Sequence, residues 1–497
     1  MGKAGKQKKR RREEQQQQQQ HGGFAASGAS DEEGDGRPST EQIEEAARVI
    51  DHLACNAGEF GHAAFRPLRT ALHKLMSSGV WQGQASGGAP PSKHEQISSA
   101  LRVGDWAVAV GGLREMYQKK IVPKLGTLQR WVRECDGVFT EEHLDEGSLT
   151  CLDAILRAAD PGGVGIIRGS FSIDNVDLPA PDTRLRLIEQ YEDWDPISAA
   201  RILSKKYIDI EKDIEPGTTK CPCGDADCCY FDDTNPVTST VCAVIPASER
   251  TPPNKYDLRI HSTSRRPLRL HDANHFTDKH RREVYPCQFV SGAFLVKDLL
   301  QPWECRRIID MAEKFGYDPD EAATGSAVEK NSVLAHACVW LADEQLTSEL
   351  WQRAKKAGLP ANCEGAVGLN RRFRCYRYRP GSVYRPHIDG AWPPSGETMG
   401  DDVAGAEDGY IYDASGGAVL SKFTFLIYLN QDFTGGGTTF YAASARKEGV
   451  LERRSVKPRT GSALVFPHGA NSAALHEGSE VSEGAKYVIR TEILFPI

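Results

Sequence analysis

The first half of the chain repeats hydrophobic residues at helical spacing. One face carries Ile43, Ala47, Ile50 and Ala54, and a break rich in Gly, Pro and Ser follows near residues 83–92. Further stripes, each three or four residues apart, comprise Trp106, Val110, Leu113 and Tyr117, then Leu128, Trp131, Val132 and Cys135, then Leu152, Ile155 and Leu156. Pro123 ends the first of these stripes. The pattern predicts a helical domain over residues 41–160.

Residues 101–136 resemble a pentatricopeptide-type helical hairpin. They cover scarcely one and a half units, whereas a solenoid needs three or more. We therefore expect a small helical domain, with repeat-type RNA binding as the alternative. Residues 161–285, rich in Asp, Pro and Arg, are expected to form an irregular linker region with a cysteine cluster, and the pattern gives no fold for them.

From residue 286 onward the pattern changes. An apolar entry is followed by a predicted helix with Ile308, Met311, Ala312 and Phe315 facing inward. Short β-branched and aromatic runs separated by Gly, Pro and Asp turns then continue to the C-terminus. They favour an antiparallel barrel or jelly roll over residues 286–497, and hence an α+β protein.

Composition changes this picture mainly at the N-terminus. Residues 1–40 hold a basic run, a glutamine run and a Gly/Ser/Asp-rich stretch, so we expect a disordered tail. The basic run is a nuclear localisation signal, a nucleic-acid-binding arm or simply a solvated tail. No apolar window is long enough to span a membrane and no secretory signal is visible. The expected location is intracellular, in the nucleus or cytoplasm, without membrane contact.

The densest cysteine cluster offers one candidate metal site. Tetrahedral sulfur ligation of a structural Zn²⁺ could come from Cys221, Cys223, Cys228 and Cys229. The spacing differs from paired C-x2-C, and reduced loop thiols or a redox pair are the alternatives. Further ligands could come from His271, His275 and His280, although these lie among Arg and Lys residues and a solvated basic face is the other interpretation.

A second candidate metal site lies in the C-terminal half. His387 and Asp389 are two residues apart on a predicted strand, so both side chains point to the same face. His476, from a distant strand, would complete two imidazoles and one carboxylate on one side of an ion. This is the facial arrangement of non-haem Fe(II) oxygenases, which leaves positions open for a 2-oxo acid and O2.

A bound 2-oxoglutarate would also need a buried cation for its distal carboxylate. Lys486, ten residues past His476, is the first candidate, and Arg490 is the second or an accessory cation. Hydroxyl groups that could face the same pocket belong to Tyr378, Tyr384 and Thr424. His468, on a Phe-Pro-His-Gly turn, is expected to be an exposed loop residue.

These motifs resemble the prolyl 4-hydroxylase-like catalytic domain of the 2-oxoglutarate/Fe(II) dioxygenase superfamily. The resemblance covers some two-fifths of the chain and rests on the segments GLNRRFRCYRYRPGSVYRPHIDG, FTFLIYLN, GGGTTF, RTGSALVF and LHEGSEVSEGAKYVIRTEILF. It implies a double-stranded β-helix with supporting helices. It also implies Fe(II) held by His387, Asp389 and His476, and 2-oxoglutarate held by Lys486, where the family sometimes has Arg. O2 and ascorbate are the other implied cofactors.

The resemblance further implies hydroxylation of a C–H bond with release of succinate and CO2. A prolyl residue in a protein is the favoured substrate, and nucleic acid or a small molecule is the alternative. A nucleic-acid-binding scaffold with a vestigial oxygenase domain is the competing reading. The insertion between Gly390 and Ser421 is longer than a hairpin turn needs, and is either a substrate-contacting lid or disordered filler.

Overall fold

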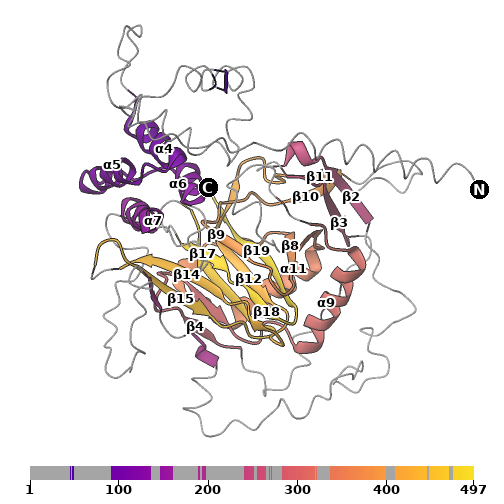
Figure 1. Cartoon of the computed structure of the whole chain (residues 1–497). Coiled ribbons are helices and arrows are strands. Elements are labelled where there is room, and N and C mark those ends of the chain that lie inside the picture. The colour runs from indigo at the N-terminus through magenta and orange to yellow at the C-terminus, as the bar shows by residue number, and fades with distance from the viewer. Residues whose placement is uncertain are drawn as a thin grey trace, which may run out of the picture. The chain divides into compact units, whose positions relative to one another are not determined.

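A computed structural model shows how these patterns fold (Figure 1). The chain divides into two compact units, Met1–Gly61 and His62–Ile497, and the elements below belong to the second. The structure describes residues 45, 48–49, 91–135, 146–160, 188–190, 193–197, 240–250, 254–264, 268, 270, 282–319, 321, 336–398, 409–444, 447–469 and 474–497. The basic tail, the cysteine cluster, the three histidines near residue 275 and the first helical stripe apart from isolated positions lie outside these residues.

Within residues 91–160, the described part of the predicted helical region forms α4 (Lys93–Val103), α5 (Trp106–Gln118), α6 (Leu125–Glu134) and α7 (Glu146–Ala159). Helix α4 begins at a capping box formed by Ser92 and Glu95, and it ends at Gly104, whose φ of 76° suits a residue without a side chain. The hydrophobic stripes of α5, α6 and α7 are largely buried against one another.

Two main sheets form the C-terminal part. The five-stranded sheet has the order β1-β15-β14-β17-β9, and the ten-stranded sheet has the order β2-β3-β6-β8-β19-β12-β16-β5-β4 with β7 beside β19. The five-stranded sheet comprises β1 (Ile188–Gln190), β9 (Tyr384–His387), β14 (Thr438–Ala443), β15 (Leu451–Val456) and β17 (Leu475–Gly478). The ten-stranded sheet comprises β2 (Thr240–Ile245), β3 (Leu258–Ser262), β4 (Val284–Pro286), β5 (Phe294–Val296), β6 (His336–Leu341), β7 (Gly368–Leu369), β8 (Arg372–Tyr378), β12 (Val419–Tyr428), β16 (Ala463–Pro467) and β19 (Lys486–Pro496). The expected α+β class is confirmed.

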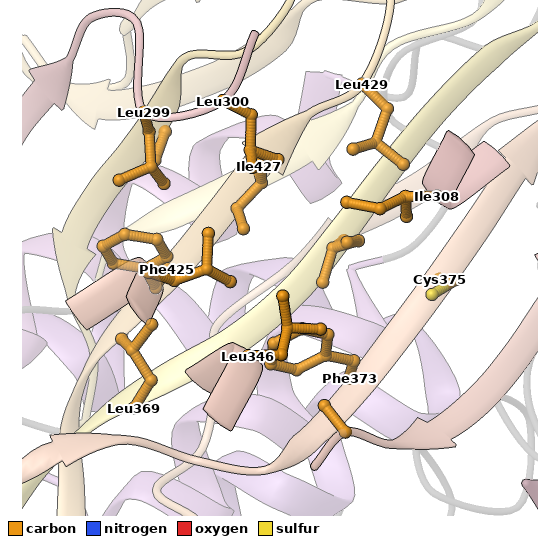
Figure 2. Packing of buried hydrophobic residues seen from close by; sticks show 14 of the residues in the cluster. Leu299, Leu300, Ile308, Leu346, Leu369, Phe373, Cys375, Phe425, Ile427 and Leu429 are labelled. Atoms are coloured by element: carbon orange, nitrogen blue, oxygen red, sulfur yellow. The ribbon is translucent and has the colours of Figure 1, made fainter. Parts of the chain in front are cut away.

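Alternation along the strands divides the interior into two cores. Phe373, Cys375, Phe425 and Ile427 pack with residues of α9 (Pro302–Phe315) and α11 (Glu344–Lys356), as Figure 2 shows for part of this cluster. A second core has residues from both sheets and includes Tyr378, Tyr428, Phe440, Phe466 and Val488. The ten-stranded sheet is therefore covered on one face by helices and on the other by the five-stranded sheet.

A fully buried ion pair joins the two covering helices. Arg353 of α11 donates to both carboxylate oxygens of Glu304 of α9, at 2.8 and 3.0 Å, and neither side chain is exposed. Two parallel hydrogen bonds of this kind fix the mutual orientation of the helices.

The region for which the sequence pattern gave no fold contributes strands β1, β2 and β3, and the start of β4, to the two sheets. Strands β2 and β3 pair with each other, and β3 runs parallel to β6 at one end of the ten-stranded sheet. Inside the insertion after Gly390, β10 (Gly396–Thr398) pairs with β11 (Gly409–Ile411). No helix in the described part of the chain is long and apolar enough to cross a membrane.

Candidate metal centre

Two neighbouring strands bring the three predicted ligands together. His387 ends β9 and His476 lies in β17, and the two residues are direct partners in the antiparallel ladder. One ligand atom from each of His387, Asp389 and His476 lies within 4.8 Å of the others. The Nε2 atoms of His387 and His476 lie 3.4 and 3.7 Å from the two carboxylate oxygens of Asp389. Three donors thus converge on a volume the size of one ion.

The hydrogen bonds of the imidazoles direct their Nε2 atoms at that volume. His387 Nδ1 lies 2.7 Å from the carbonyl oxygen of Arg385, and His476 Nδ1 lies 2.9 Å from that of Ala474. Because a carbonyl oxygen only accepts, each Nδ1 carries the hydrogen. A neutral ring then presents the Nε2 lone pair, which is the state that a metal ligand requires.

Burial and charge set the protonation of the other groups. Burial, followed by the neighbouring His387, lowers the pKa of His476 to about 3, so its ring is neutral. Burial alone would raise the pKa of Asp389, but the Arg490 guanidinium holds it well below its usual range. Asp389 is only 6% exposed. An ionised carboxylate beside neutral imidazoles is a donor set suited to a divalent cation.

Two residues expected at the 2-oxoglutarate pocket contact Asp389. Thr424 donates a hydrogen bond of 2.6 Å to one carboxylate oxygen. Arg490 forms an ion pair with the other oxygen at 3.0 Å, and its other partner is Glu492 at 3.5 Å. Their contacts therefore orient the carboxylate that faces the histidines.

The prediction that His468 is an exposed loop residue is wrong. It is partly buried, with Nδ1 3.2 Å from Thr424 Oγ1 and Nε2 3.0 Å from Ser421 Oγ. Burial lowers its pKa to about 4. His468 therefore belongs to the hydrogen-bond network behind Asp389, where β12 and the end of β16 meet.

Lys486 lies in a separate buried position on the same sheet. It is 1% exposed, and its Nζ donates 2.5 Å to the carbonyl oxygen of Gly436 and lies 4.8 Å from the ring centre of Tyr378. No carboxylate of the described residues forms an ion pair with it. Burial lowers its pKa to about 7. A buried amine without a counter-ion is suited to receive an anion.

Tyr378 lies beside Lys486, and Tyr384 lies beside the candidate metal ligands. Tyr378 is the ladder partner of Lys486, and a Cβ added at Gly478 would approach its hydroxyl oxygen to 2.8 Å. Glycine at position 478 therefore leaves room for the Tyr378 hydroxyl. The ring of Tyr384 lies 4.6 Å from that of His387 and 5.5 Å from that of Tyr376. Of the two tyrosines, Tyr378 is closer to Lys486 in the sheet and Tyr384 is closer to the histidines.

One contact at the centre was not expected from the sequence. Ile388, which lies between His387 and Asp389 just after the end of β9, is buried in the core formed by α4 to α7, as is Leu475, next to His476. Gln129 of α6 donates a hydrogen bond of 3.0 Å to the carbonyl oxygen of Ile388. The helices therefore support the back of both ligand segments. Gln129 and Ile388 are 259 residues apart in the chain, so the sequence around either residue does not predict this contact.

Comparison with known proteins finds a similarity in the C-terminal region. Residues 373–491 match the family model described as the 2OG-Fe(II) oxygenase superfamily, which confirms the expected resemblance for this part of the chain. No curated protein matches the chain.

Solved structures similar to this chain include three prolyl hydroxylases. The viral collagen prolyl hydroxylase of Paramecium Bursaria Chlorella virus-1 is 19% identical, over 41% of this chain and 97% of that one, with a TM-score of 0.27. A Pseudomonas putida prolyl-4-hydroxylase is 14% identical, over 41% and 92%, with a TM-score of 0.26. A Trichoplax adhaerens prolyl hydroxylase, in complex with a peptide fragment, is 16% identical, over 41% and 83%, with a TM-score of 0.27.

Proposed function

We propose that this chain is a 2-oxoglutarate- and Fe(II)-dependent dioxygenase that hydroxylates a C–H bond and releases succinate and CO2. The observation that carries the proposal is the convergence of His387, Asp389 and His476 within 4.8 Å, on the same sheets as the buried Lys486, which has no counter-ion among the residues that the structure describes. The strand orders β8-β19-β12-β16 and β9-β17-β14-β15 support a double-stranded β-helix.

The residues fit the two groups that this activity requires. The three ligands would hold ferrous iron, which when bound supplies the oxidative decarboxylation that drives hydroxylation. Lys486 would pair with the distal carboxylate of 2-oxoglutarate, and the Tyr378 hydroxyl would donate to the same carboxylate. Thr424 and Arg490 would keep Asp389 ionised and oriented. Ascorbate as a cofactor and zinc at the cysteine cluster stay predictions.

For the substrate we propose a prolyl residue in a protein, on the resemblance of the HxD, glycine-turn and C-terminal strand motifs. Fold and motif are weak guides to substrate, so nucleic acid and small molecules are the alternatives. A scaffold with a vestigial oxygenase domain would keep neither metal affinity nor 2-oxoglutarate turnover.

Mass spectrometry with Fe(II), 2-oxoglutarate and pools of peptides and oligonucleotides tests the proposal. The wild type should form succinate and a product heavier by one oxygen atom, and Asp389→Ala should form neither. Asp310→Ala, which removes a carboxylate on the exposed side of α9, should behave as wild type. A wild-type protein that binds no divalent metal and consumes no 2-oxoglutarate would contradict the proposal.

A further inference from the structure

A second buried cation lies near the metal centre. Arg372 of β8 is 5% exposed, and its Nη1 atom is buried without a hydrogen-bond partner. No ion pair to its guanidinium is formed by the residues that the structure describes. Its contact is with the ring of Trp392, whose centre lies 4.1 Å from Cζ. A guanidinium buried without an anion is costly, as it is for the Lys486 amine.

Glu492, the carboxylate among the charged neighbours of Arg372, forms no ion pair with it in the described part of the chain, although Glu492 Oε1 is itself buried without a hydrogen-bond partner. Glu492 accepts a hydrogen bond of 3.0 Å from Asn370 and lies 3.5 Å from Arg490. The charged neighbours of Arg372 are Glu492 and two further cations, Arg374 and Arg490. Positive charge therefore exceeds negative charge around this guanidinium in the described part of the chain.

Strand geometry places Arg372 beyond the metal centre as seen from Lys486. Positions 372, 374, 376 and 378 of β8 share one face, and Arg374 and Tyr378 are ladder partners of Arg490 and Lys486. Since Arg490 contacts Asp389, Arg372 lies one step, about 7 Å, past the level of that carboxylate. Lys486 lies two steps, about 13 Å, to the other side.

Trp392 holds this position in place. Its backbone N–H donates 2.8 Å to Ser421 Oγ, and its carbonyl oxygen accepts 2.9 Å from the Ser421 N–H. The indole is thereby tied to β12, the strand that carries Thr424. The stacked pair of Arg372 and Trp392 is thus built on the same strands as the metal centre.

We propose that Arg372 binds a carboxylate of the substrate, which makes an acidic peptide the preferred substrate class. This inference rests on the proposed function and specifies its substrate. A guanidinium that has no ion-pair partner among the described residues matches a single monoanionic carboxylate, which it can bind through two parallel hydrogen bonds. A nucleic acid would instead need a run of cations that follows its backbone.

Paired peptides test the assignment. Short proline-containing peptides carry Asp or Glu at each position on either side of the proline, and matched peptides carry Asn or Gln. For the wild type with Fe(II) and 2-oxoglutarate, KM should be lower for the best acidic peptide by about 10- to 100-fold, the value of hydrogen bonds to a charged group. Arg372→Gln should remove this preference, and Arg372→Lys should keep part of it.

A matched control and a second readout separate the possible failures. Lys422→Gln removes an exposed cation that lies over Phe495, and it should keep the preference. Peptide binding to the Mn(II)- and 2-oxoglutarate-loaded protein is measured by calorimetry, so that the preference is observed without turnover. Binding of acidic peptides without turnover would support the subsite and refute the proposed function. Three results would overturn the assignment of Arg372 as a carboxylate-binding residue. They are turnover with equal KM for both peptide sets, binding of no acidic peptide, and preferential binding of oligonucleotides.

Discussion

Binding of 2-oxoglutarate should draw a proton from solution, because Lys486 is uncharged in the free protein above neutral pH. Burial lowers the pKa of the Lys486 amine to about 7, from an ordinary value of about 10.5. A dicarboxylate beside the amine favours the ammonium form, so the amine takes up a proton as the ligand binds.

The expected uptake follows from the pKa. With a pKa of about 7, roughly 0.9 of the amines are neutral at pH 8 and roughly 0.1 at pH 6. Binding should therefore take up close to 0.9 proton at pH 8 and close to 0.1 at pH 6. The lowered pKa of Lys486 also affects the stability of the ligand-free protein. Below pH 7, burying the charged amine reduces the free energy of unfolding by at most about 5 kcal/mol, and this reduction disappears as the pH rises toward 10.5.

Calorimetry in buffers of different ionisation enthalpy measures the uptake directly. The protein is preloaded with Mn(II), so that proton release from the metal ligands does not contribute. Lys486→Arg keeps a charged side chain at both pH values and should show no uptake at pH 8. Wild-type binding at pH 8 without proton uptake would refute the assignment of Lys486 as the partner of the distal carboxylate.

Three further predictions concern stability and reactivity. Ile388→Ala leaves a cavity between α4–α7 and β9, so the free energy of unfolding measured in urea should fall by about 2–4 kcal/mol. Val367→Ala at an exposed position is the control, and an equal fall in both variants would contradict the packing. Arg353→Met leaves the buried carboxylate of Glu304 without its partner and should lower the free energy of unfolding by about 3–5 kcal/mol. Adding Glu304→Gln in a double variant should restore part of that stability. Burial raises the pKa of the Cys287 thiol to about 12, so iodoacetamide should label it only after unfolding, and rapid labelling of the folded protein would argue otherwise.

Local pattern was enough to find the residues that converge on the metal site. Strand alternation pairs His387 with Asp389 in the sequence, although in the structure β9 ends at His387 and Asp389 follows it. His476 and Lys486 lie on β17 and β19, with only the short strand β18 (Val481–Glu483) between them. The amphipathic stripes of the helices were readable for the same reason, since they repeat within a few residues.

Contacts between distant strands were not readable in this way. Nothing near Thr424 or Arg490 shows that their side chains meet Asp389, because β12 and β19 become neighbours only when the sheet forms. His468 looks exposed on its turn, yet Ser421 and Thr424 approach it from another strand. The sequence pattern did not predict strands β2 and β3. The strand that joins them to the main sheet, β6, lies more than seventy residues downstream of β3.

The support of Ile388 and Leu475 by the helices has a consequence for ligation chemistry. Each of these side chains is the chain neighbour of a candidate metal ligand and points the opposite way, so loosening the helical layer would also misplace the candidate ligand atoms. By thermodynamic reciprocity, an ion that rigidifies β9 and β17 must strengthen the attachment of α4–α7 by the same free energy. Occupancy of the centre and docking of the helices are then one coupled equilibrium, in which a ligand on the outer face of α6 could tune the affinity for metal.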